Sequence, residues 1–141
     1  MKAFFDTSVL VAAFYADHEH HAASLDLLVG FPKKVGCCAA HSLVEVYSTL
    51  TRMPGKHRVN GEQAMLFIAD LEERLSIVGL DPHEYVAALA GFASLKIAGG
   101  AVYDAFLAAC ALNARAERIF TWNLRHYAQL GPEVAKRLKT P

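Results

Sequence analysis

The sequence lacks an excess of charge of either sign. Its 141 residues include 14 Lys and Arg against 14 Asp and Glu, so the formal net charge is zero. This balance excludes the strong positive field of a general nucleic-acid coat protein, and any contact with nucleic acid must come from local patches or from a bound metal ion. With 54% hydrophobic and 20% charged residues, the composition is that of a folded protein rather than a disordered one.

Cysteine is scarce as well. The three cysteines are Cys37, Cys38 and Cys110. An odd number with an adjacent pair is a poor framework for disulfides, so we expect buried free thiols in a reducing compartment. No C-x-x-C pair is present and no H-x-x-x-H pair accompanies these residues, so a structural zinc site is not predicted.

Long hydrophobic runs are also missing. The apolar run at the N-terminus stops at Asp6, which is too early for the core of a signal peptide. The most apolar later region, residues 97–114, is interrupted by Asp104 and is too short to span a bilayer. We therefore expect a cytoplasmic protein without membrane contacts, folded as one domain over residues 1–141.

The sequence instead contains an alternation of short apolar runs and helical patterns. Apolar runs bounded by turn residues predict strands at residues 3–5, 34–39, 77–80 and 118–121. Helical spacing predicts helices at 9–15, 18–29, 41–52, 61–75, 83–97 and 102–114, and a helical turn at 123–127. This alternation predicts an α/β fold with a parallel sheet and helices on its faces. The tail, residues 132–141, fits either a last helix or a short edge strand.

The first strand is followed directly by Asp6, Thr7 and Ser8. Ser8 fits the N-cap of the next helix, and the simplest role for Asp6 is to share in that cap. An aspartate here also lies just beyond the carboxyl end of a strand, where open α/β sheets place their ligands. Considered alone, the segment favours the capping role.

Two further acids stand in apolar surroundings. Glu45 lies within residues 42–47 and Asp104 within residues 101–107. A carboxylate near the core must be paired or bound to a cation, or its pKa rises. Arg52, two helical turns beyond Glu45, is the best local partner. Singly, each acid fits a cap or an ion pair. Together, three acids on three elements indicate an oxygen-ligand site for Mg²⁺ or Mn²⁺, ions that support phosphodiester hydrolysis.

Several of these segments together resemble the motifs of PIN-domain ribonucleases. They are Phe5–Leu10, Glu45 after the second strand, Tyr103–Ala111, Phe120–Asn123 and His126–Tyr127. Within that family, the likeness is greatest to the toxins of VapBC toxin–antitoxin pairs, and it covers essentially the whole chain. The resemblance implies a three-layer α/β/α fold with a central parallel sheet of four or five strands. The reaction it implies is metal-dependent hydrolysis of RNA.

The resemblance also implies roles for individual residues. Asp6, Glu45 and Asp104 would hold the divalent ion, directly or through water. Hydroxyl groups would order the site by hydrogen bonds, from Thr7, Ser8 and Thr121. Asn123 completes the expected catalytic set, at a position where many family members carry an aspartate. Its amide can accept hydrogen bonds or ligate through oxygen but brings no charge, so the cation site is weaker than one with four acids.

Local basic residues are candidates for binding RNA phosphates. Arg52, Lys56 and Arg58 lie near Glu45 in the sequence, and Arg125 follows Asn123. A loop of solvated charges explains the first group equally well.

Three further features have simpler interpretations beside functional ones. Trp122 could stack on a base, although packing at the sheet edge is the simpler interpretation. Residues 17–21 contain three histidines whose spacing does not converge on a helix, which favours an exposed helix start over a metal site. Met65 and Phe67 fit a homodimer surface, a site for an antitoxin segment, or ordinary core.

The sequence therefore predicts a Mg²⁺- or Mn²⁺-dependent endoribonuclease of the PIN family that acts as a toxin. Its expected partners are an RNA substrate, a cognate antitoxin and a second copy of itself. Two alternatives remain: a PIN-like nuclease for housekeeping RNA processing or for DNA, and a degenerate PIN domain that binds RNA or a partner without cutting. Asn123 is the residue that keeps the second alternative open.

Overall fold

A computed structural model describes residues 1–141, and its centre is a sheet of five parallel strands. The strands are β1 (Ala3–Phe5), β2 (Gly36–Ala39), β3 (Ser76–Val78), β4 (Arg118–Phe120) and β5 (Leu138–Lys139). Their order across the sheet is β3-β2-β1-β4-β5. The chain thus builds outward from β1 in one direction and then in the other. In open parallel sheets, ligands bind beyond the carboxyl ends of the strands at such a reversal.

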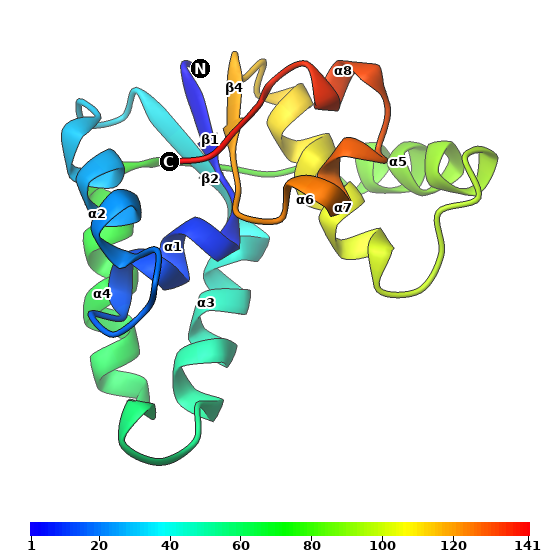
Figure 1. The fold of residues 1–141 in the computed structure, drawn as a ribbon. Coiled ribbons are helices and arrows are strands. Elements are labelled where there is room, and N and C mark those ends of the chain that lie inside the picture. The colour runs from blue at the N-terminus through cyan, green and yellow to red at the C-terminus, as the bar shows by residue number, and fades with distance from the viewer.

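Helices cover both faces of this sheet (Figure 1). They are α1 (Thr7–Phe14), α2 (His21–Gly30), α3 (Ala40–Arg52), α4 (Gly61–Arg74), α5 (Pro82–Ser94), α6 (Ala101–Asn113), α7 (Leu124–Ala128) and α8 (Pro132–Ala135), with a 3₁₀ turn η1 (Gly55–His57). Helices α1 to α4 lie on one side of the strands and α5 to α8 on the other (Figure 1). The predicted three-layer α/β/α fold is confirmed, and the sheet has five strands.

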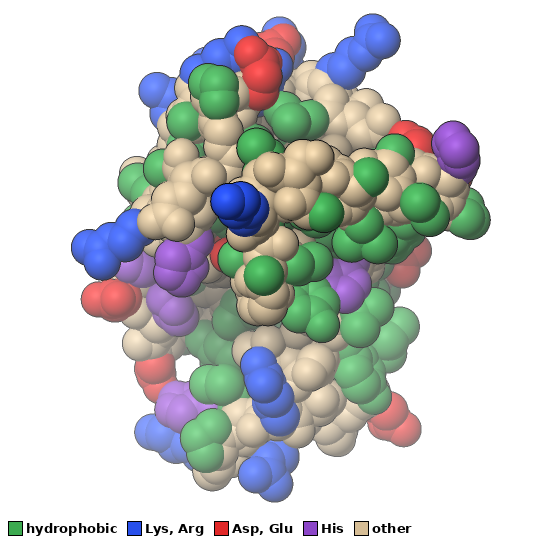
Figure 2. Space-filling view, turned by 90° about the vertical axis from the view of Figure 1, so that its right-hand side faces the viewer, with side chains coloured by type: hydrophobic (Ala, Val, Ile, Leu, Met, Phe, Trp, Pro, Cys, Tyr) green, Lys and Arg blue, Asp and Glu red, His purple; other side chains and the backbone are tan.

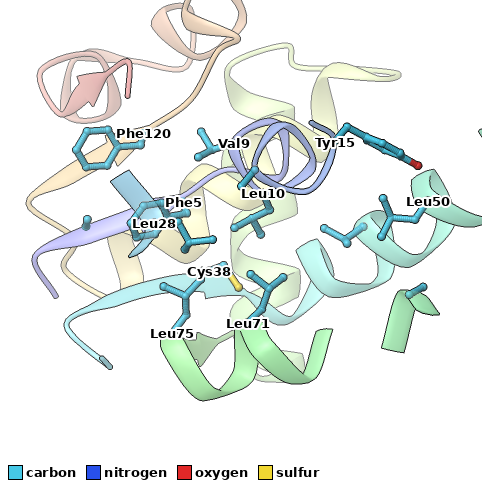
Figure 3. Packing of buried hydrophobic residues seen from close by; sticks show 14 residues of the cluster. Phe5, Val9, Leu10, Tyr15, Leu28, Cys38, Leu50, Leu71, Leu75 and Phe120 are labelled. Atoms are coloured by element: carbon cyan, nitrogen blue, oxygen red, sulfur yellow. The ribbon is translucent and has the colours of Figure 1, made fainter. Parts of the chain in front are cut away.

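Successive residues of β1 face the two helical layers. Phe5 belongs to a buried cluster with residues of α1 to α4, several of which Figure 3 shows around it. Phe4 belongs to a second cluster with residues of α6 to α8. Side chains alternate along a strand, so a sheet covered on both faces needs apolar residues at every position. This explains why the first strand is apolar throughout.

The first helix begins differently from the prediction. Its N-cap is Asp6, whose backbone is extended (φ −67°, ψ 153°). The Asp6 carboxylate accepts a hydrogen bond from Ser8 N in the first turn of α1. The prediction of Ser8 as the N-cap is therefore wrong. Ser8 already lies in the first turn, and its hydroxyl donates to the Asp6 carboxylate as well.

Two other predictions need correction at the ends of elements. Helix α2 begins at His21 rather than His18, so His18 and His20 lie in the loop before it. The tail forms both of the alternatives considered, α8 followed by β5.

The expected free thiols are confirmed, because all three cysteines are buried and unpaired. Burial raises the pKa of the Cys37 thiol to about 11. None of the helices combines the length and the apolar character that crossing a membrane requires.

Candidate active site

A cavity of about 470 Å³ lies where the loops after β1 and β4 meet α3 and α6. Asp6, Glu45 and Asp104 all line it, although they come from three separate parts of the chain. Asn123 lines it too. No Lys or Arg is among its lining residues, which are Asp6, Thr7, Ser8, Val11, His18, Glu19, His20, Glu45, Thr49, Asp104, Leu107, Trp122 and Asn123. The cavity thus concentrates carboxylates without a permanent cation.

Asp6 is almost fully buried, at 2% exposure, and is satisfied by hydroxyl groups. Its Oδ2 accepts hydrogen bonds from Ser8 Oγ at 2.6 Å and from Thr121 Oγ1 at 2.8 Å. Its Oδ1 accepts a hydrogen bond from the Tyr127 hydroxyl at 2.6 Å. A buried carboxylate must find such donors, because leaving water without them is costly.

Backbone amides fix the direction of two of these hydrogen bonds. Trp122 N donates to Ser8 Oγ at 3.1 Å, and Asn123 N donates to Thr121 Oγ1 at 2.9 Å. Since each hydroxyl oxygen already accepts from an amide, its own proton can point at Asp6. The loop after β4 therefore holds the Asp6 carboxylate in one orientation.

Glu45 and Asp104 face Asp6 from the two helical layers. Thr7 Oγ1 donates to Glu45 Oε1 at 3.0 Å. Burial raises the pKa of Glu45, and the negative charges of Asp6 and Asp104 act in the same direction. Burial raises the pKa of Asp104 as well, followed by the charge of Asp6. The three carboxylates line one cavity, so their negative charges lie near one another.

The only basic side chain in contact with these acids is an imidazole. His126 Nδ1 lies 3.6 Å from Asp104 Oδ2, and the His126 side chain is largely exposed. The expected pairing of Arg52 with Glu45 is wrong, because no ion pair joins them. Seven residues along a helix span about 10 Å, which is too far for a direct contact in this geometry.

The donor set fits a hard divalent cation. It offers carboxylate and amide oxygens, the ligands that Mg²⁺ and Mn²⁺ prefer, and its repelling charges would be relieved by a cation. No three acidic, histidine or cysteine side chains are arranged closely enough to form a metal site by themselves. A cation here would complete its coordination with water, as Mg²⁺ commonly does in proteins.

Two further cavities adjoin the acids. One, of about 470 Å³, shares Glu45 with the acid cavity and is lined by Arg52. The other, of about 630 Å³, shares Asp104 and is lined by Lys96 and His126. The acid cavity therefore has a neighbouring cavity on the Glu45 side and another on the Asp104 side, and each neighbour is lined by one permanent cation.

The other predicted RNA-binding residues are placed elsewhere. Lys56 and Arg58 lie at the turn that joins α3 to α4, the lowest part of the molecule in Figure 1. Arg58 Nε donates to the Met53 carbonyl. Neither these two residues nor Arg125 line any of the three cavities around the acids.

Sequence reasoning missed several residues at this site. Tyr127 is buried, and burial together with the Asp6 charge raises the pKa of its hydroxyl, which therefore keeps the proton that it donates. The His126–Tyr127 pair belonged to a recognised motif, but nothing in its spacing shows that the hydroxyl reaches Asp6. Lys96 gave no signal at all.

The loop before α2 also reaches the site. The prediction of a merely exposed helix start at residues 17–21 is wrong in this respect, because His18, Glu19 and His20 line the acid cavity. The ring of His20 stacks on the indole of Trp122, with centroids 3.7 Å apart and planes 8° from parallel.

Comparisons with known proteins agree with this geometry. The model of the PIN domain family matches residues 3–129. Ribonuclease VapC40 of Mycobacterium tuberculosis is 36% identical over 120 residues, which cover 85% of each chain. Ribonuclease VapC27 of the same organism is 30% identical over 112 residues, 79% of this chain and 78% of the relative.

Solved structures share the fold at low sequence identity. The crystal structure of Mycobacterium tuberculosis VapC20, described as a sarcin–ricin loop cleaving toxin, has a TM-score of 0.72 at 18% identity and covers 94% of this chain and 98% of its own. VapBC2 from Rickettsia felis, bound to promoter DNA, has a TM-score of 0.67 at 16% identity, covering 99% and 98%. A toxin–antitoxin complex from Klebsiella pneumoniae has a TM-score of 0.69 at 17% identity, covering 99% and 97%.

Proposed function

Because this chain belongs to the PIN domain family, we propose that its three converging acids are the active site of a divalent-metal-dependent endoribonuclease, the toxin of a toxin–antitoxin pair. Relatives that match most of the chain are named ribonucleases. The observation that carries the proposal is the acid cavity: Asp6, Glu45 and Asp104 meet there without Lys or Arg. We further propose that residues 1–141 form a single nuclease domain.

The metal would be Mg²⁺ or Mn²⁺, held by Asp6, Glu45 and Asp104. When bound, such an ion polarises a phosphoryl oxygen and lowers the pKa of a water molecule. Thr7 holds Glu45 by its hydrogen bond, and the hydroxyls of Ser8 and Thr121 hold Asp6. These contacts keep the ligand oxygens oriented before the ion arrives, which is the usual task of groups behind metal ligands.

Asn123 would act at the edge of the same site. Its side chain is exposed and makes no hydrogen bond, while its backbone amide is used to orient Thr121. The carboxamide is therefore free to accept a hydrogen bond from a water molecule in the cavity or to donate one to the substrate.

The two neighbouring cavities support a path for the RNA backbone across the acids. Arg52 lies in the cavity on the Glu45 side and Lys96 in the cavity on the Asp104 side. Phosphates flanking the scissile one would contact these two residues, because phosphate binding depends on local positive charge. Lys56, Arg58 and Arg125 stay predicted contacts for phosphates farther from the cut.

A cognate antitoxin and a second copy of the chain are the proposed protein partners. The toxin–antitoxin complexes that share this fold support the first of these. Large hydrophobic side chains are exposed on α5, including Tyr85, Val86 and Leu89. Figure 2 shows hydrophobic side chains spread over the side of the molecule that carries α5 and α6. Of the two residues considered from the sequence, Met65 is exposed, whereas Phe67 packs against the core.

Cleavage of RNA with added Mg²⁺ or Mn²⁺ tests the active site. We expect Asp6→Asn and Asp104→Asn each to lower the rate by more than about 100-fold, since losing a ligand should cost more than losing a group behind it. Asp26→Asn is the matched control, because Asp26 is exposed on α2 and makes no ion pair. Equal cleavage by the native chain and both active-site variants would rule the proposal out.

Asn123 favours one second candidate, a domain that binds RNA without cutting it. Calorimetric titration with Mg²⁺ and Mn²⁺ in the presence of RNA separates the two functions. Binding of the metal that is lost in Asp6→Asn supports the nuclease. No metal binding, together with intact RNA binding, supports the non-catalytic domain.

A further inference from the structure

The loop between α1 and α2 places an imidazole ring flat on the only tryptophan of the chain. His20 and Trp122 are separated by 102 positions in the sequence, yet their rings are nearly parallel with centroids 3.7 Å apart. Both residues line the acid cavity. Neither ring has a role in the proposed reaction.

The stack is firmly held on its tryptophan side. Trp122 Nε1 donates to the hydroxyl of buried Ser24 at 2.8 Å, and Trp122 N donates to Ser8 Oγ at 3.1 Å. Ser8 Oγ in turn donates to the Asp6 carboxylate. The indole is thereby fixed relative to the carboxylate at the centre of the site, with one hydroxyl between them.

The His20 ring makes few local contacts, of which one is with the tilted ring of His18, with centroids 5.7 Å apart. His20 precedes α2 at the N-cap position, but its side chain makes no capping hydrogen bond. Its only ionic contact is Nε2 with Oε1 of its exposed neighbour Glu19, at 3.4 Å. The His20 side chain keeps 36% of its surface exposed, although one ring face lies against Trp122. An accessible aromatic surface thus borders the acid cavity.

We propose that the His20–Trp122 pair is a stacking platform for one unpaired base of the RNA substrate, next to the scissile phosphate. This inference rests on the proposed function and names how that site would select its substrate. Unpaired RNA bases are recognised by stacking on aromatic rings, and histidine is one of the residues used. A cavity of about 470 Å³ is of small-ligand size, which suits a single splayed nucleotide rather than a duplex.

The single tryptophan provides a direct test by fluorescence. The protein carries Asp104→Asn and is kept in EDTA, so that the RNA is bound without being cut. It is titrated with a short single-stranded RNA and, separately, with an abasic oligomer of the same length and charge. We expect base-dependent quenching of Trp122 by the RNA and little quenching by the abasic oligomer.

Variants of the platform should affect the two probes differently. We expect His20→Ala to weaken RNA binding by about 5- to 150-fold, the range for one stacked base, and to leave the affinity for the abasic oligomer unchanged. His20→Phe keeps an aromatic ring, so it should bind RNA within a few-fold of the parent. The matched control is His83→Ala, because His83 is exposed on α5 and lines none of the cavities around the acids.

Two results would overturn the platform. One is equal RNA affinity for His20→Ala and His83→Ala. The other is a His20→Phe variant that melts like the parent but binds RNA as weakly as His20→Ala. The cleavage assay is a separate test. If the native chain cuts RNA but RNA binding causes no base-dependent quenching of Trp122, the platform is ruled out and the nuclease proposal stands. If RNA binding causes base-dependent quenching but Asp6→Asn cuts RNA as fast as the native chain, the platform stands and the nuclease proposal is ruled out.

Discussion

At the residue scale, Asp6 shows how a buried carboxylate is kept in place without a cation beside it. Three side-chain hydroxyls donate to it, and they belong to Ser8, Thr121 and Tyr127. Two of these donors follow β4, more than a hundred residues away in the sequence. The acid is therefore positioned by tertiary structure, and its surroundings respond to substitutions in distant segments.

Tyr127→Phe should weaken the fold measurably. The substitution keeps the ring in the core but removes the donor to Asp6 Oδ1, and hydrogen bonds to charged groups contribute about 1.5–3 kcal/mol. We expect the free energy of unfolding to fall by that amount in urea at neutral pH with EDTA. Tyr85→Phe, at an exposed ring, should change it by less than about 0.5 kcal/mol. Equal stability of both variants would show that the Tyr127 hydrogen bond contributes nothing.

Asp104 gives the metal-free protein a pH dependence of defined sign. Its pKa in the folded state is raised above 3.8 by burial and by the charge of Asp6, so the folded state binds a proton more readily than the unfolded state does. Native stability therefore rises as the pH falls through the interval between the raised pKa and 3.8, and is reduced at neutral pH. Asp104→Asn removes this contribution to the pH dependence of stability.

We accordingly expect Asp104→Asn to be more stable than the native chain at pH 7.5 in EDTA. The advantage should shrink as the pH is lowered toward 4, in urea unfolding across that range. Adding Mg²⁺ or Mn²⁺ should stabilise the native chain more than the variant, because a ligand that binds only the folded state raises its stability. Asp26→Asn should show none of these trends. An advantage of Asp104→Asn that is the same at every pH would contradict the assignment.

At the scale of elements, replacing glycine by alanine should have opposite effects on stability at two positions. A Cβ at Gly36 in β2 would lie 2.5 Å from Phe5 Cε2. The Phe5 ring cannot give way easily, because it contacts Phe31 edge-on and stacks on Phe120. A Cβ at Gly91, within α5, would meet nothing within 4 Å.

We expect Gly36→Ala to destabilise the protein by about 1–3 kcal/mol, the usual cost of overpacking a core. Gly91→Ala should stabilise it by about 0.5–1 kcal/mol, because alanine is the better helix residue. Chemical denaturation measures both. If Gly36→Ala did not destabilise the protein, the tight contact between β2 and the Phe5 ring would not exist in solution.

The main elements could be predicted from the sequence because each has a strong periodic signal. Helix α3 was placed within one residue, since its apolar spacing is regular and Pro54 follows it. The start of α1 was missed because Asp6 and Ser8 are both good caps, and only the fold decides between them. The tail was ambiguous because its helix and strand have only four and two residues.

The centre of the site was predictable for a related reason. Asp6 follows a strand, and carboxyl ends of parallel strands share one edge of the sheet, so acids on several elements can meet there. The contacts made by Tyr127, His20 and Lys96 were not predictable. They depend on the direction of individual side chains between segments far apart in the chain, which no local pattern encodes.

At the scale of the whole molecule, the net charge is zero, so the salt dependence of RNA binding should come from local cations. Each phosphate neutralised on a single strand contributes about −0.7 to the slope of log K against log salt. For an RNA short enough to reach only Arg52 and Lys96, the two cations beside the acids, we expect a slope of about −1.4. A general RNA-coating protein would show a much steeper one.

Removing one cation should lower that slope by about 0.7, in either Arg52→Gln or Lys96→Gln. With this short RNA, Lys56→Gln should leave the slope unchanged, because Lys56 lies at the far turn between α3 and α4. Fluorescence titrations in EDTA at several salt concentrations measure the slope. A loss in Lys56→Gln equal to that in Arg52→Gln would place the RNA backbone on that turn instead.

The central position of β1 has a consequence for the time at which the protein becomes active. Strand β1 pairs with β4, which is made much later, and Asp6 N donates to the Phe120 carbonyl. On a translating ribosome, the acid that ends β1 emerges more than a hundred residues before Thr121 and Tyr127, which hold it. A nascent chain thus carries its central carboxylate for most of its synthesis without the groups that orient it. During that interval the nuclease is incomplete, and the interval ends only after Thr121 and Tyr127 have left the exit tunnel.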